Sequence, residues 1–131
     1  MYTNARSIKN KHNELCASVK FIKPKLICIT ETWLHEDIPD SCYHIPGFRL
    51  FRCDNPFNIG HDGVCIYVEH VIANSFNVDV KTHDLPGIDN LFLHLSSQNF
   101  SAVIGCIYRP RGSPLDASLG NLVNALSHNN K

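Results

Sequence analysis

The chain has 131 residues, 44% hydrophobic and 18% charged, which is typical of one globular domain with a core. Twelve basic and twelve acidic residues cancel; this excludes the strong positive field of many nucleic-acid-binding proteins, so DNA would have to be contacted by a local site. No apolar run reaches the ~18 residues of a membrane span and no signal-peptide pattern begins the chain, so we expect an intracellular protein without membrane contact.

The first third of the chain is predicted to contain a strand end, a helix and a buried strand. Residues 1–3 look like the tail of a strand that runs into the first helix. Apolar residues recur at three- and four-residue steps over 7–23, which predicts an amphipathic helix that Pro24 ends. The apolar run 26–30 does not alternate, so we expect a strand covered on both faces.

The middle of the chain is predicted to alternate loops and strands. Pro, Asp, Ser and Gly over 34–47 predict a loop with one short helical turn. Apolar and basic residues alternate over 48–53, as in a half-buried strand. After an Asn-, Pro- and Gly-rich loop, residues 63–68 predict a strongly apolar strand.

The last part of the chain is predicted to form further strands and a closing helix. Residues 71–80 read as a strand with polar interruptions, and 90–95 with 100–108 as a hairpin around 96–99. Leucines and a valine over 115–126 predict a second amphipathic helix before a polar tail. Adjacent strands with helices before and after them favour a mixed sheet covered by helices.

Six cysteines are interpreted as reduced thiols. Three of them lie inside apolar runs, where a thiol behaves as a small hydrophobe: Cys28, Cys65 and Cys106. One loose cluster has the residue types of a metal site, but its spacing fits no familiar zinc pattern, so we expect no zinc there. Its members are Cys42, His44, Cys53 and His61.

Polar residues stand where two apolar runs end. Glu31 follows 26–30, Tyr108 ends the run 100–108, and Arg109 follows it. If these two strands are neighbours in the sheet, the three side chains converge at one edge, where Asn4 could join them. Alone, each side chain has an ordinary structural explanation as a loop carboxylate, a core aromatic or a surface charge, so only the set supports a functional hypothesis.

The set has the chemistry of a metal-assisted phosphoester site. A carboxylate is a hard oxygen ligand for Mg²⁺, which often uses one or two carboxylates with substrate phosphate. An Asn carbonyl can hold the water shell of the metal. Tyr and Arg donate to phosphate oxygens and can orient a phosphodiester.

Four motifs appear in the order seen in endonuclease/exonuclease/phosphatase domains, and the chain resembles that family. They are Asn-Ala-Arg-Ser-Ile at 4–8, Lys-Pro-Lys-Leu-Ile-Cys-Ile-Thr-Glu-Thr-Trp-Leu at 23–34, Gly-Val-Cys-Ile-Tyr-Val at 63–68 and Gly-Cys-Ile-Tyr-Arg-Pro at 105–110. The chain looks most like the apurinic-endonuclease-like nuclease at the start of non-LTR retrotransposon polyproteins.

The resemblance implies an α/β (α+β) fold, a four-layer α/β sandwich with two mixed sheets face to face and helices outside. It implies phosphodiester cleavage with Mg²⁺ or Mn²⁺, DNA as substrate, fusion to a reverse transcriptase that the freed 3′-hydroxyl primes, and a nuclear location. By motif, Glu31 would be the metal ligand and Asn4 a helper at the metal or its water. Tyr108 would contact phosphate, and Arg109 would lie near the substrate backbone.

The chain also departs from the family pattern. Residues 1–131 read as a single partial domain that lacks most of the first strand before Asn4 and the C-terminal half, with its Asp-x-Asn and Ser-Asp-His motifs. The usual approach to the third motif is replaced by Asp54-Asn55 and Gly60-His61-Asp62-Gly63. Because hydrolysis needs a positioned nucleophile with a proton acceptor as well as charge neutralisation, we expect the chain to be inactive alone.

Three interpretations remain open at this stage. The first is an N-terminal piece of a retroelement nuclease, either a truncated gene model or a degenerate genomic copy. The second is a superfamily member that hydrolyses other phosphate esters. The third is a non-catalytic α/β interaction module in which Glu31 and Tyr108 merely cap strands.

Overall fold

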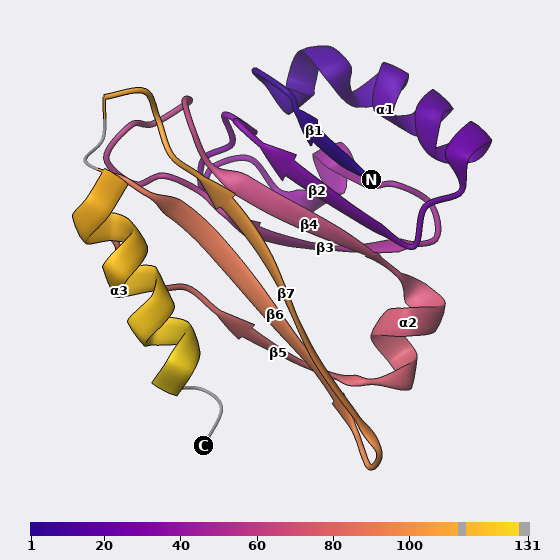
Figure 1. Cartoon of the computed structure of the whole chain (residues 1–131). Coiled ribbons are helices and arrows are strands. Elements are labelled where there is room, and N and C mark those ends of the chain that lie inside the picture. The colour runs from indigo at the N-terminus through magenta and orange to yellow at the C-terminus, as the bar shows by residue number, and fades with distance from the viewer. Residues whose placement is uncertain (113–114, 129–131) are drawn as a thin grey trace.

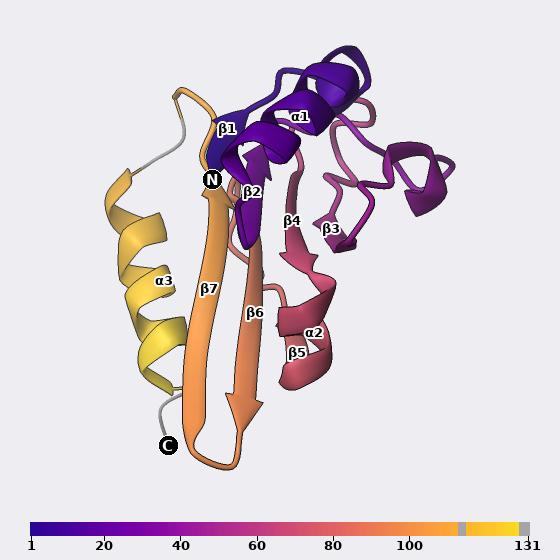
Figure 2. The same cartoon turned by 90° about the vertical axis from the view of Figure 1, so that its right-hand side faces the viewer.

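The computed structural model, which describes residues 1–112 and 115–128, consists of two β-sheets packed face to face with a helix on the outer side of each (Figures 1 and 2). This arrangement confirms the expected α/β class with sheets flanked by helices. The elements in chain order are β1 (Tyr2–Asn4), α1 (Ile8–Ile22), β2 (Leu26–Thr30), the 3₁₀ turn η1 (Asp40–Tyr43), β3 (Phe48–Cys53), β4 (Val64–Glu69), α2 (His70–Ser75), β5 (Asn77–Lys81), β6 (Asp89–Ser97), β7 (Phe100–Tyr108) and α3 (Leu115–His128).

The first sheet has the strand order β1-β2-β4-β3, and the second has the order β5-β6-β7. In the first sheet β1 runs parallel to β2, whereas β4 is antiparallel to both β2 and β3, so this sheet is mixed as expected. The second sheet is antiparallel throughout its described strands. The predicted hairpin is confirmed as β6 and β7, but its turn is shorter than the predicted 96–99, because Ser97 already pairs with Phe100.

Helix α1 forms where the apolar periodicity predicted it. Ile8, Leu15 and Val19 are buried against the first sheet. The helix ends at Ile22 and is capped by Lys23, which has a left-handed backbone (φ 53°) and whose N–H donates to the carbonyl of Val19 at 2.9 Å. Pro24 then directs the chain into β2.

The core has two parts, one on each face of the first sheet. Alternate residues of β2 face opposite sides, so Ile27 and Ile29 pack beneath α1 while Cys28 faces the second sheet. The part between the sheets is built mainly by β4, β6 and β7; its fully buried members are Val64, Ile66, Val68, Leu91 and Leu93. The prediction that β2 is covered on both faces is therefore confirmed.

The predicted strand over 71–80 is wrong in its first half. Residues His70–Ser75 form the short helix α2, and the strand β5 begins only at Asn77. The helix buries Ala73 in the core between the sheets and connects the end of β4 to the second sheet. The need to cross from one sheet to the other thus outweighs the β-propensity of Val71 and Ile72.

The arrangement considered above, with 26–31 and 100–108 as neighbours in one sheet, is not the one observed. Strand β2 belongs to the first sheet and β7 is an edge strand of the second, and the two pack face to face. A buried strand has the same apolar pattern whether its neighbour is paired with it in one sheet or packed against it from another sheet. The pattern alone could therefore not distinguish the two arrangements.

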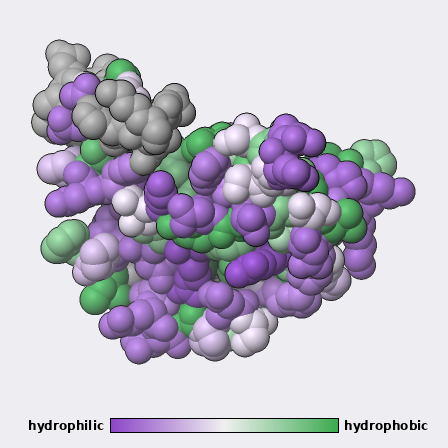
Figure 3. All heavy atoms as spheres, turned by 90° about the horizontal axis from the view of Figure 1, so that it is seen from below, coloured by the Kyte–Doolittle hydropathy of each residue, from purple (hydrophilic) through white to green (hydrophobic). Residues whose placement is uncertain are grey.

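Helix α3 and the mostly polar surface are typical of a folded domain. Helix α3 covers the predicted range 115–126, and the predicted polar tail at 129–131 lies outside the described residues. Polar residues cover most of the face seen from below, with apolar residues between them (Figure 3). No helix in the described ranges is both long and apolar enough to cross a bilayer.

Gly63, at the start of β4, is fixed by a close contact. Its φ of +83° is a left-handed conformation, and a Cβ at this position would lie 2.7 Å from Oγ1 of Thr32. Thr32 is 1% exposed, so its hydroxyl cannot move aside into solvent. Gly60 provides a control, because it has a similar φ of +77° with open space around it.

We predict that Gly63→Ala destabilises the fold more than Gly60→Ala. Both substitutions place a Cβ in the left-handed region at a cost of ~1–2 kcal/mol. Gly63→Ala adds the clash with Thr32, an overpacking cost of ~1–3 kcal/mol. Urea denaturation of the two variants measures the difference, and equal losses of unfolding free energy would contradict the close contact.

Candidate active site

Glu31 directly follows β2 and is fixed by backbone hydrogen bonds on both sides. Its carbonyl accepts from the N–H of Ser7 at 3.0 Å, and the N–H of the next residue, Thr32, donates to the carbonyl of Gly63 at 3.2 Å. Trp33 N–H donates to the carbonyl of Asp62 at 2.9 Å. The segment after β2 is therefore held between the start of α1 and the start of β4.

Backbone strain concentrates in these three segments. Among the described residues, six that are not glycine have positive φ, and one of them is the helix cap Lys23. The other five all lie in the segments just described: Arg6, Ser7, Glu31, Trp33 and Asp62. Such residues cost of order 1–3 kcal/mol each and cluster at functional sites, so this corner of the fold is a candidate site.

Two side chains from different strands, Asn4 and Tyr108, meet at the Glu31 carboxylate. Asn4, the last residue of β1, donates from Nδ2 to Oε1 of Glu31 at 2.8 Å. Tyr108, the last residue of β7, donates its phenol hydrogen to the same carboxylate. Glu31 is half-buried and Asn4 is exposed, so the cluster faces solvent.

The surroundings of Tyr108 keep its phenol protonated. Burial, the hydrogen bond to Glu31 and the negative charges of Glu31, Asp62 and Asp89 together raise the pKa of Tyr108 to about 12. At neutral pH the phenol is therefore a hydrogen-bond donor and not a base.

Asp89 lies near Tyr108, where its charge acts on the phenol, and it was not identified from the sequence. It stands opposite Tyr108 in the β6–β7 pairing. Its carboxylate accepts from Gly63 N–H at 2.7 Å and from Asn55 Nδ2 at 3.0 Å. Burial, with the charge of Asp62, raises the pKa of Asp89. The pairing of Asp89 with Tyr108 follows from a turn at residues 98–99, whereas the predicted loop over 96–99 would place residue 87 across from 108.

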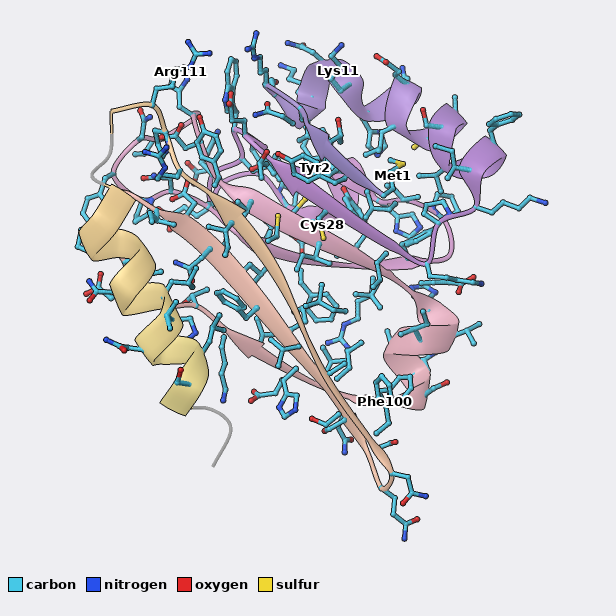
Figure 4. All side chains as sticks on the ribbon, viewed as in Figure 1. Met1, Tyr2, Lys11, Cys28, Phe100 and Arg111 are labelled. Atoms are coloured by element: carbon cyan, nitrogen blue, oxygen red, sulfur yellow. The ribbon has the colours of Figure 1, made fainter. Side chains whose placement is uncertain are left out.

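The structure thus brings together Asn4, Glu31 and Tyr108, although β2 and β7 belong to different sheets. Arg109 is exposed and follows Tyr108 at the end of β7. The side chain of Arg111, two residues further on, points outward at the same end of the molecule (Figure 4). The catalytic, metal and substrate roles of these residues stay predictions.

The side chains around Glu31 suit a divalent cation that keeps most of its bound water molecules. In the described part of the chain no group of three or more His, Cys, Asp or Glu side chains is arranged around one point, so these residues do not form an all-protein cage. Mg²⁺ commonly binds through one or two carboxylates plus water and substrate phosphate. Glu31 can supply the carboxylate, because two neutral donors leave several of its lone pairs available.

Comparisons with known proteins show what the fold is similar to. No protein-family model matches the chain, and no curated protein matches it. Solved structures do match. The endonuclease domain of TRAS1, a telomere-specific non-LTR retrotransposon, aligns with a TM-score of 0.63 at 15% identity, covering 97% of this chain and 51% of that domain.

Two further structures give the same result. The AP endonuclease LMAP from Leishmania major aligns with a TM-score of 0.62 at 17% identity, covering 90% of this chain and 41% of that one. The human Nocturnin catalytic domain, solved with a bound sulfate anion, aligns with a TM-score of 0.65 at 13% identity, covering 92% and 51%. The chain therefore shares the fold of these proteins and spans about half of their length.

We predict that Glu31→Gln lowers the pKa of Tyr108 from about 12 towards the ordinary tyrosine value of ~10. The substitution removes the negative charge that favours the protonated phenol, while the burial of Tyr108 is unchanged. NMR titration of ¹³Cζ-labelled tyrosine measures the shift, and Tyr108→Phe assigns the signal. Glu14→Gln, on the exposed face of α1, is the control; an unchanged Tyr108 pKa in Glu31→Gln would contradict the contact.

Proposed function

We propose that this chain carries the metal-binding and phosphate-contacting part of a divalent-metal-dependent phosphodiesterase that acts on DNA, of the kind found in non-LTR retrotransposons. The observation that supports the proposal is the meeting of Asn4 and Tyr108 at the carboxylate of Glu31. The superfamily fold and the nucleases among the matching structures, TRAS1 and LMAP, support the substrate class.

Each residue has a role that its position allows. Glu31 binds Mg²⁺ or Mn²⁺, which would neutralise charge on a phosphodiester. Asn4 orients the carboxylate through its 2.8 Å hydrogen bond. Tyr108, kept neutral by its raised pKa, donates to a phosphate oxygen, and Arg109 contacts the backbone of the substrate.

The same geometry favours a catalytic ancestry over a non-catalytic interaction module. If Asn4, Glu31 and Tyr108 only ended their strands, their side chains would not be expected to meet at one carboxylate. The positive φ values of Glu31 and Asp62 are a cost that a simple strand end does not require.

The metal-binding role predicts that Mn²⁺ binds at Glu31. In NMR titrations, Mn²⁺ is expected to broaden the amide signals of Asn4, Thr32 and Tyr108 first. Glu31→Gln should abolish this broadening, and Asn4→Ala, which removes an orienting partner, should weaken binding ~10–100-fold. Glu36→Gln, an exposed carboxylate nearby in the chain, is the control; broadening that survives Glu31→Gln would refute the assignment.

We further predict that the 131-residue polypeptide does not nick DNA by itself. Asn4 cannot accept the proton of an attacking water, and Tyr108 holds its own proton at neutral pH. The test is incubation of supercoiled plasmid with Mg²⁺ and the purified chain, with Glu31→Gln alongside. Nicking by the wild type that Glu31→Gln abolishes would disprove the predicted inactivity while retaining the nuclease proposal.

A further inference from the structure

Two cysteines face each other between the sheets, close to the candidate active site. Cys28 lies on β2 three residues before Glu31, and Cys106 lies on β7 two residues before Tyr108. Both belong to the core between the sheets, and Figure 4 shows the Cys28 side chain in the space between them. This thiol pair therefore joins the two strands that carry the site.

The contacts of the pair are specific. Cys106 donates a hydrogen bond from Sγ to the carbonyl of Ile29 at 3.6 Å, so its side chain reaches the backbone of β2. When Cys28 is ionised, the same Cys106 S–H can instead donate to the Cys28 sulfur. That bond lowers the pKa of Cys28 to about 7 and raises the pKa of Cys106.

The two thiols differ in accessibility, as a reactive and a resolving cysteine do. Cys28 is partly exposed, whereas Cys106 is 3% exposed. A substantial fraction of Cys28 is thiolate near neutral pH, and the thiolate is the form that reacts with oxidants. Cys106 is held beside it as a protonated thiol.

We propose that Cys28 and Cys106 form an oxidisable dithiol that a peroxide converts into a disulfide between the two sheets. The Cys28 thiolate attacks one peroxide oxygen, the O–O bond breaks, and Cys28 becomes a sulfenic acid while the other oxygen leaves as hydroxide. The Cys106 sulfur then attacks the sulfenic sulfur, the S–O bond breaks and water leaves. Two thiols are oxidised by two electrons, and the peroxide is reduced.

The other cysteines lack this combination of features. Cys65 is fully buried on the opposite face of the first sheet, beneath α1, and burial raises its pKa. Burial also raises the pKa of Cys53. Cys16 lies on α1 with a contact to His12 at 3.7 Å, and Cys42 is exposed in the 3₁₀ turn. The reaction should therefore select Cys28 and Cys106.

The disulfide would connect β2 to β7 covalently, a few residues before Glu31 and Tyr108 along each strand. The inference does not depend on the proposed function, because the thiol chemistry needs neither metal nor DNA. It adds a modification site in the core between the sheets, at the position that sets the spacing of the two strands.

The test uses the full chain, reduced and then treated with a small excess of hydrogen peroxide. Mass spectrometry is expected to show the loss of two hydrogen atoms, and peptide mapping without reductant should find the peptides of Cys28 and Cys106 linked. Cys42→Ser should form the same link. In Cys106→Ser the link should be absent and dimedone should trap sulfenic acid at Cys28.

A second measurement covers the case in which Cys106→Ser fails to fold. Oxidised wild type should melt at a higher temperature than reduced wild type, because the cross-link constrains the unfolded chain, and Cys28→Ser should show no such shift. A wild-type map with Cys106 still free, or with Cys28 linked to a different cysteine, would overturn the proposal regardless of how the variants behave.

Discussion

The packing of the two sheets against each other is the constraint on which the candidate site depends. Glu31 and Tyr108 come from strands that share no sheet, so no hydrogen-bonded ladder sets their separation. The side chains between the sheets set it instead, and Ile66, Leu91 and Leu93 there are fully buried. Interiors of this kind are close-packed, so a change of volume in this core would alter the contact between the carboxylate and the phenol.

The first sheet contributes a second constraint, which acts on the backbone. Residues 30–33 donate and accept hydrogen bonds with the start of α1 on one side and with the start of β4 on the other. Glu31 and Trp33 in this segment have left-handed conformations, and the buried Thr32 between them lies against Gly63. The strained corner and the orientation of Glu31 therefore have one cause, the close approach of β4 to the end of β2.

The sequence predicted most of the elements because their patterns are strong and local. The periodicity of α1, the apolar runs of β2 and β4 and the turn of the β6–β7 hairpin each depend on near neighbours in the chain.

The failures of the sequence prediction concern the long-range arrangement of the elements. Residues 71–75 form a helix because the chain changes sheets there. The set of Asn4, Glu31 and Tyr108 was correctly expected to meet, but through face-to-face packing and not through a shared sheet, and Asp89 was missed because its role depends on hairpin register.

The electrostatics of the site explain how a chain with no net charge could bind DNA, the polyanion that the proposed function requires. Glu31, Asp62 and Asp89 all act on Tyr108, so the local field is negative and would repel a phosphate. A divalent cation at Glu31 would reverse that field, since a bound ion is often the largest local charge in such a site. The two neutral donors on Glu31 hold the carboxylate in one orientation without cancelling its charge. A cation bound at Glu31, as proposed, would therefore meet a carboxylate that is already ordered in the folded chain.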